Sequence, residues 1–185
     1  MRKIAAGLFI TMDGVTEEPS NWQETFDEDM GAAMQAVLDR TDTILLGRVT
    51  YEYWKTYWPN YKGGEDESFA TFINTTPKVV VSKTLRGASW GEFDNIKLVS
   101  NNLAEELGKL KQQPGRTISV LGSPGLVNSL IQLDLLDELT LIIHNVAAYQ
   151  GKRLFDQGNL KRFNLVDAKP TPSGTIIATY QPRQS

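Results

Sequence analysis

The 185-residue chain has no cysteine and a single histidine, His144. The absence of cysteine excludes disulfides, thiolate nucleophiles and cysteine-ligated metals, and one histidine excludes a two-histidine zinc site. His144 could still act as a lone general acid or base. It lies in the apolar run 139–146, where a core or interface histidine is the more typical case. We therefore expect no metal site.

Long apolar runs and excess positive charge are also missing. No stretch approaches the roughly 20 apolar residues that cross a bilayer, and Met1-Arg2-Lys3-Ile4 does not begin a secretory signal. The net charge of −3 disfavours non-specific nucleic-acid binding. We expect a cytoplasmic protein that binds neither membranes nor nucleic acid and forms one domain over residues 1–185.

Short apolar runs alternate with helical patterns along most of the chain. Strands are predicted at 3–10, 43–46, 78–82, 96–99, 117–121, 138–146, 160–168 and 174–181. Helices are predicted from Thr25, with Glu28 completing a capping box, at 49–57, at 67–73, from Asn102, with Glu105 in the same role, and at 125–133. This order predicts an α/β fold of three layers, α/β/α, with a mixed, mostly parallel sheet and an antiparallel C-terminal hairpin.

The first functional pattern is a strand, a tight turn and a helix start at residues 43–58. Ile44-Leu45-Leu46 stops at Gly47, and Arg48, Val49 and Thr50 follow. A helix N-terminus offers free N–H groups to an anion, glycine permits close approach, and arginine suits phosphate. The alternative is an ordinary βα turn with a surface arginine.

Two more strands end in residues that suit phosphate. Val79-Val80-Val81 runs into Ser82, Lys83 and Thr84, and a later strand runs into Gly122, Ser123, Pro124, Gly125 and Leu126. Because ligands of open α/β sheets lie at the carboxyl ends of strands, the three turns predict one extended anionic ligand such as a dinucleotide. Arg48 with the 82–84 cluster could bind an extra ribose phosphate, which favours NADPH over NADH. Plain turn chemistry is the alternative.

Substrate-binding candidates lie near the first strand and in the second helix. Asp13 opens the long loop 11–24 and could orient a substrate or hold a proton, although Asp-Gly is also a common turn. Trp22, Tyr51 and Trp54 could stack on a heterocycle. With Tyr57 and Trp58 they form a set of five aromatics, of which we expect at least two to be core or interface residues only.

Five segments together form a pattern found in a known family. They are Thr11-Met12-Asp13-Gly14, Leu45-Leu46-Gly47-Arg48-Val49-Thr50-Tyr51-Glu52 with Trp54, Lys78-Val79-Val80-Val81-Ser82-Lys83-Thr84-Leu85, Leu121-Gly122-Ser123-Pro124-Gly125-Leu126 and Leu135-Leu136-Asp137-Glu138-Leu139. In this order they resemble the dihydrofolate-reductase-like superfamily. The nearest branch is the C-terminal reductase domain of the bifunctional riboflavin-pathway deaminase/reductase, with its stand-alone bacterial relatives.

The resemblance implies a fold, a cofactor and an assembly. It implies a three-layer α/β/α fold, NADPH and a homodimer. Residues 47–50 would hold cofactor phosphate and ribose, 82–84 would lie near the adenosine phosphate, 122–126 would cradle the pyrophosphate, and Asp13 would face the substrate. The chain departs from the family at Asn145-Val146 and at the turn 147–153, which borders the substrate region.

The sequence thus predicts an NADPH-dependent reductase of a small heterocyclic substrate, with Asp13 as the candidate catalytic residue. The first specific hypothesis is 5-amino-6-(5-phosphoribosylamino)uracil reductase of riboflavin biosynthesis. Dihydrofolate reduction is one alternative, and it would need a carboxylate such as Asp27 or Glu24 facing the pterin. A non-catalytic nucleotide-binding or regulatory protein is the other.

Overall fold

The structure is a computed structural model that describes residues 1–183. Its centre is an eight-stranded sheet in the order β4-β3-β2-β5-β1-β6-β8-β7. The strands are β1 (Ile4–Thr11), β2 (Thr41–Gly47), β3 (Lys78–Val81), β4 (Ile96–Val99), β5 (Thr117–Val120), β6 (Glu138–His144), β7 (Phe163–Pro170) and β8 (Ile176–Pro182). Only β8 pairs antiparallel, with β6 on one side and β7 on the other. This confirms the mixed sheet with an antiparallel C-terminal hairpin.

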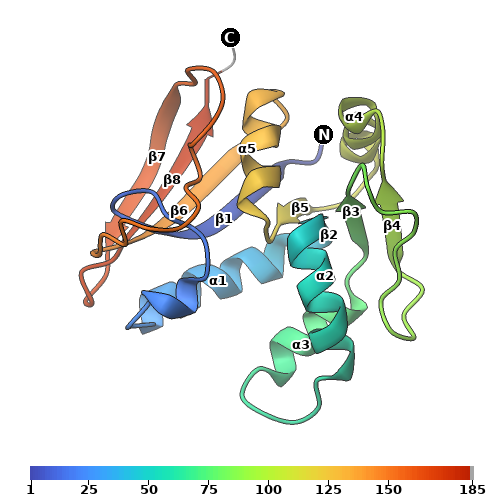
Figure 1. Ribbon diagram of the computed structural model, residues 1–185, viewed down its shortest axis with the longest axis horizontal. Coiled ribbons are helices and arrows are strands. Elements are labelled where there is room, and N and C mark those ends of the chain that lie inside the picture. Colours follow the sequence, from blue (N-terminus) through green and yellow to red (C-terminus); the bar gives the residue numbers. More distant parts are fainter. Residues whose placement is uncertain (184–185) are drawn as a thin grey trace.

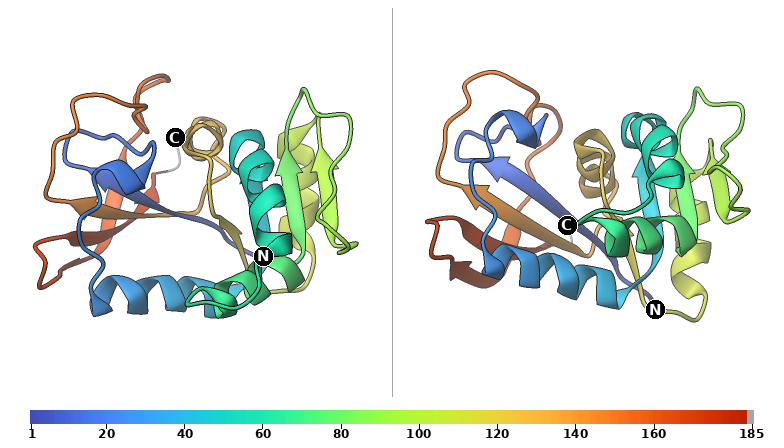
Figure 2. Two further views of the ribbon diagram at one scale, coloured as in Figure 1. Left: turned by 60° about the horizontal axis from the view of Figure 1, so that its bottom comes forward. Right: turned by 90° about the horizontal axis from the view of Figure 1, so that it is seen from below.

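Within residues 1–183, five α-helices cover the two faces of the sheet (Figures 1 and 2). They are α1 (Glu28–Arg40), α2 (Arg48–Tyr57), α3 (Glu67–Thr75), α4 (Leu103–Gln112) and α5 (Pro124–Gln132). The left view of Figure 2 shows α1 and α5 on opposite sides of the strands, which confirms the three layers. No helix within residues 1–183 is both long and apolar enough to span a bilayer.

The apolar residues of the strands divide between two cores. One core joins Ile4 and Val120 to Leu107 of α4 and Leu130 of α5. The second core lies on the other face of the sheet and is built largely from the aromatic segment between β2 and β3 and from Trp90. Because successive strand residues point to opposite faces, neighbouring residues of one strand belong to different cores. Both cores are needed to bury a sheet that is covered on two sides.

Both predicted capping boxes were wrong. Helix α1 begins at Glu28, and Asp27 caps it by accepting the Met30 N–H at 3.0 Å. Asp27 also accepts the Ser173 N–H from the β7–β8 turn at 3.3 Å, so the capping residue also contacts a segment distant in sequence. Asn102, which precedes α4, has a left-handed backbone (φ 52°) and makes no side-chain cap.

Tyr51 lies in the second core and not at a ligand-accessible surface. Its side chain is 1% exposed, and its ring packs 6.5 Å from that of Trp90. Its hydroxyl accepts the Ser89 N–H at 2.9 Å and donates to the Ser89 carbonyl at 3.1 Å. The structure therefore corrects the expectation that Tyr51 stacks on a substrate, because core packing leaves no face of the ring free.

Substituting Tyr51→Phe should lower the free energy of unfolding by about 1–2 kcal/mol, because two hydrogen bonds to Ser89 are lost while the ring remains. Urea denaturation measures the loss, and nucleotide affinity should stay unchanged. If the variant is as stable as the wild type but binds nucleotide more weakly, Tyr51 belongs to the ligand site.

Candidate active site

Four polar turns follow four neighbouring strands at one edge of the sheet. The strands β3, β2, β5 and β1 are adjacent in that order and mutually parallel. Their carboxyl ends carry Ser82, Gly47, Leu121-Gly122 and Asp13 respectively. The three turns predicted to bind a nucleotide are therefore direct neighbours, although they are far apart in sequence (Figure 1).

Two glycines let the β2–α2 and β5–α5 turns touch. A Cβ on Gly47 would stand 2.3 Å from the Ser123 hydroxyl oxygen, and a Cβ on Gly122 would stand 2.7 Å from that of Thr50. The Gly47 N–H donates to the Gly122 carbonyl at 3.1 Å. Gly122 also has φ +117°, a backbone conformation that strongly favours glycine. Any side chain at either position would push the turns apart.

The touching turns bring together the N-termini of α2 and α5, and neither helix is capped by a side chain. Gly47 and Ser123 precede the two helices, neither makes a side-chain cap, and neither first turn contains an acidic residue. Helix α1, in contrast, has a capping carboxylate and two acidic residues in its first turn. Uncapped N–H groups and positive helix ends favour an anion. This pair of ends is the strongest candidate for a pyrophosphate site.

Charged and hydroxyl side chains flank this pair of helix ends. Arg48 is half-exposed and pairs with Glu52 one turn along α2, at 2.6 Å. Ser82 is buried, and its hydroxyl accepts the N–H groups of Thr84 and Leu85 at 3.2 and 3.1 Å. Ser82 thus shapes the third turn, whereas Lys83 and Thr84 are exposed.

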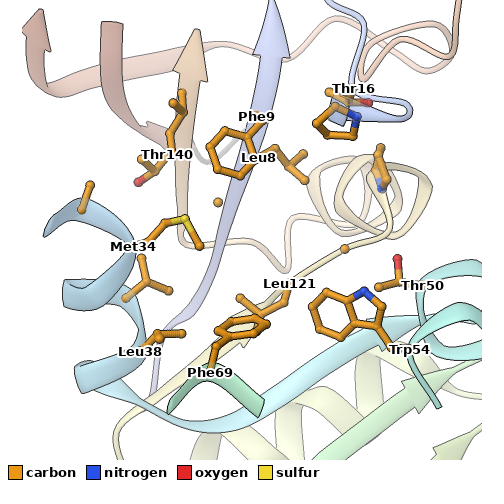
Figure 3. A pocket seen from close by; sticks show the side chains of 17 residues that line it. Leu8, Phe9, Thr16, Met34, Leu38, Thr50, Trp54, Phe69, Leu121 and Thr140 are labelled. Atoms are coloured by element: carbon orange, nitrogen blue, oxygen red, sulfur yellow. The ribbon is translucent and has the colours of Figure 1, made fainter. Parts of the chain in front are cut away.

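A largely apolar cavity of about 400 Å³ adjoins the two touching turns (Figure 3). Its walls come from β1, β6, α1, α2, α3, the β5–α5 turn and the loop after β1. The lining residues are Gly7, Leu8, Phe9, Thr16, Pro19, Ala33, Met34, Val37, Leu38, Thr50, Trp54, Phe69, Leu121, Gly122, Pro124, Thr140 and Ile142. This volume lies within the ordinary range of ligand pockets.

Some predicted site residues line this cavity and others do not. Trp54 does, and so do Thr50, Gly122 and Pro124 of the predicted cofactor turns. Trp22 lies outside it: its indole N–H donates to the Glu17 carbonyl at 3.0 Å, and its ring meets the edge of His144 at 5.4 Å. Of the three aromatics predicted to bind substrate, Trp54 is the one that lines the cavity.

Sequence reasoning did not identify most of the apolar wall of the cavity as part of a binding site. Helical spacing alone would place the stripe of Ala33, Met34, Val37 and Leu38 in the core, but Met30 is the only buried residue of α1. Figure 3 shows Met34 and Leu38 facing Phe69 and Trp54 across the cavity. A usable signal was Gly7, since glycine in a strand interior often marks a place where something else must fit.

Asp13 holds the loop after β6 and does not line the cavity. Its carboxylate accepts the Thr11 hydroxyl at 2.6 Å and the N–H groups of Ala148 and Tyr149 at 3.0 and 2.8 Å. The Arg153 Nη2 lies 3.3 Å from the Asp13 Oδ2, and the Arg153 Nε–H donates to the Asp13 backbone carbonyl. The Thr11 hydroxyl, aided by the two backbone donors, lowers the pKa of Asp13 from 3.8 to about 2. Asp13 is thus a stably ionised anchor in this geometry.

His144 sits at the end of β6, 3% exposed, between the rings of Phe9 and Trp22. Burial lowers the pKa of its imidazole, and the charge of Asp27 partly opposes that shift. The residue is thus a buried strand histidine, as its apolar surroundings in the sequence indicated. Within residues 1–183 no group of three or more potential ligand side chains is arranged to hold a metal.

The fold is that of an α/β protein in which two uncapped helix N-termini adjoin an apolar pocket. Residues 2–177 match the model of the RibD C-terminal domain, so the chain belongs to that family. A Bacillus subtilis (strain 168) relative, the uncharacterized protein YyaP, is 32% identical over 97% of this chain and 94% of its own.

Solved structures show the same fold. A Shewanella sp. PV-4 protein assigned to riboflavin biosynthesis superposes with a TM-score of 0.79 at 16% identity, covering 98% of this chain and 99% of its own. Enterococcus faecalis dihydrofolate reductase complexed with NADP(H) gives 0.64 at 13% identity, covering 98% and 97%. The Thermotoga maritima deaminase/5-amino-6-(5-phosphoribosylamino)uracil reductase gives 0.70 at 12%, covering 98% of this chain and 57% of its own. These confirm the dihydrofolate-reductase-like fold.

The Asp13→Asn variant should be less stable than wild type at pH 7, because an amide accepts the four donors less well than a carboxylate. The folded-state pKa is depressed, so this stability difference should be full above about pH 4 and shrink as the pH falls toward 2.

Urea denaturation between pH 2.5 and 7 measures the difference. The control Asp156→Asn, on an exposed loop, should change neither the midpoint nor its pH dependence. A stability difference for Asp13→Asn that stays constant with pH would contradict the anchoring role.

Proposed function

We propose that this protein is an NADPH-dependent reductase of a small heterocyclic substrate. The observation that carries the proposal is the junction of two uncapped helix N-termini with an apolar cavity. Thr50, Gly122 and Pro124 belong to both, so a ligand that binds at the helix ends can extend into the cavity. That is the division of labour expected of a reductase, in which the cofactor brings the reactive atom and the protein orients it.

The residues at the sheet edge fit a dinucleotide. The N–H groups of α2 and α5 would hold the pyrophosphate where Gly47 and Gly122 remove side-chain bulk. A Cβ on Gly125 would meet nothing within 4 Å, so this turn is open toward a ligand. Arg48, Lys83 and Thr84 would bind the outer phosphate. The cofactor, when bound, supplies a hydride.

The pathway pyrimidine 5-amino-6-(5-phosphoribosylamino)uracil is the first substrate to assay, because the Thermotoga relative carries that name. Asp13 would assist by positioning: its contacts to Ala148, Tyr149 and Arg153 fix the loop that borders the substrate region. Its saturation with donors supports this role over proton delivery. A cytoplasmic location stays a prediction.

Dihydrofolate reduction is less well supported by the geometry. Asp27 is occupied as the cap of α1 and by the Ser173 N–H, and Glu24 is exposed on the loop before α1. Neither residue lines the cavity, so a pterin there would find no carboxylate partner from them. A purely regulatory protein is distinguished by assay, since it would bind NADPH without consuming it in the presence of either substrate.

Replacing Arg48→Ala should weaken NADPH binding roughly tenfold or more, since a charge-assisted hydrogen bond contributes about 1.5–3 kcal/mol. Fluorescence quenching measures the dissociation constants of NADPH and NADH. The wild type should bind NADPH more tightly, and the thermal midpoint without ligand should barely move.

Glu52→Gln is the matched control, because it breaks the same ion pair and keeps the cation. It should leave NADPH affinity equal or slightly higher, since an exposed helix pair contributes only about 0.3–0.5 kcal/mol. If the Arg48→Ala protein binds NADPH as tightly as the wild type, Arg48 is not part of the cofactor site.

We also propose a homodimer built on the β7–β8 hairpin. Leu165, Val166 and Ile176 are exposed apolar residues at this end of the sheet, and Phe155 lies nearby in sequence and is exposed as well. Light scattering should report about twice the 20.6 kDa chain mass. Leu165→Lys should yield monomers, whereas Gln35→Lys on the exposed face of α1 should not. A wild-type monomer at micromolar concentration would contradict the proposal.

A further inference from the structure

Among residues 1–183, no charged side chain lines the cavity. Within the part of the chain that the structure describes, none of the 17 lining residues is Asp, Glu, Lys, Arg or His. Its lining hydroxyls come from three threonines, Thr16, Thr50 and Thr140, the Trp54 indole adds an N–H donor, and aliphatic and aromatic groups make most of the rest. Charged side chains of this region, such as Arg48 and Asp13, engage partners outside the cavity.

Two of the three hydroxyls already have partners within the protein. The Thr140 hydroxyl shares a hydrogen bond with that of Thr179 at 3.1 Å, and the Thr16 hydroxyl donates to the Lys152 carbonyl at 3.4 Å. Each can therefore offer a ligand only its remaining hydrogen-bonding capacity. The walls can recognise a few polar atoms but cannot neutralise a phosphate or a carboxylate.

Placing an unpaired charge in such a site is strongly unfavourable, because the charge loses its hydration and gains no counter-ion. Flat rings suit the walls better, since Phe9, Trp54 and Phe69 present aromatic surfaces from β1, α2 and α3 (Figure 3). The charge of a ligand should therefore affect its binding in the cavity more than its shape does.

We propose that the cavity takes an uncharged, flat and mainly apolar substrate, and not one that carries a phosphate or carboxylate into the pocket. This inference rests on the proposed reductase function and names the substrate class of that same site. The pathway pyrimidine would therefore fit only with its phosphoribosyl group outside the cavity.

Gly7 makes the floor of the cavity. A Cβ built on Gly7 meets nothing within 4 Å, so a larger side chain there would project into free space without strain. Gly7→Val should fill the floor and weaken ligand binding. Ala33→Leu, from the α1 wall, should do the same from a different element. Gly108→Val is the matched control, because a Cβ on Gly108 of α4 also meets nothing within 4 Å, on the far side of the sheet.

The test uses N-phenyl-1-naphthylamine, a flat neutral fluorophore, and 8-anilino-1-naphthalenesulfonate, the same skeleton with a sulfonate. Both are titrated into the full chain with saturating inorganic pyrophosphate, so that the anion site is filled and the cavity is left free. The neutral probe should bind saturably, and the sulfonate should bind at least tenfold more weakly. Gly7→Val and Ala33→Leu should each weaken the neutral probe at least tenfold, and Gly108→Val should not.

Equal affinity for the two probes, or no saturable binding of the neutral one, would overturn the inference. So would unchanged binding of the neutral probe to both cavity-filling variants, with circular dichroism showing that they are folded. Failure of the proposed function gives a different result. NADPH would then not bind, or would bind without being oxidised, regardless of how the two probes bind.

Discussion

The contact between the β2–α2 and β5–α5 turns determines the rest of the site. It exists because positions 47 and 122 carry no side chain: a Cβ at either would stand less than 3 Å from a hydroxyl of the other turn. The contact brings two helices together by their N-terminal ends, which is electrostatically unfavourable until an anion lies between them. The fold therefore contains a local repulsion that a bound phosphate would relieve.

The apolar cavity follows from a mismatch between α1 and the sheet. The helix presents four apolar residues on one face, and the strand opposite contributes Gly7, which fills no space. A close-packed interior would leave no such gap, and a gap of this size loses dispersion contacts on both walls. A ligand would restore those contacts, so the energetic cost of the gap becomes binding energy. The chain thus combines two uncapped helix N-termini with an unfilled apolar cavity, and Thr50, Gly122 and Pro124 belong to both.

Asp13 links these parts to the loop after β6. It lies at the end of β1, and apart from the Thr11 hydroxyl the groups that its carboxylate binds come from residues 148–153. The same loop departs from the family pattern in sequence. An ionised carboxylate that accepts several N–H groups can hold an unusual loop conformation, such as the positive φ of Tyr149. Substrate preference can therefore change within the loop while the anchor and the cofactor turns stay the same.

The sequence by itself determined the order of strands and helices, the three polar turns that follow β2, β3 and β5, and the protein family. These features depend on local periodicity and on residues near one another along the chain. The sequence could not decide which apolar residues would be covered. The α1 stripe and Tyr51 look alike as patterns, yet one lines a cavity and the other fills a core, since burial depends on what the opposite element contributes. The predicted start of α1 was also wrong: Asp27 and not Thr25 caps the helix, and the Asp27 carboxylate also accepts the N–H of Ser173, which is distant in sequence. Tertiary structure alone brought Gly47 to Gly122 and left Gly7 facing open space, because both facts concern distances between segments that the chain does not connect directly.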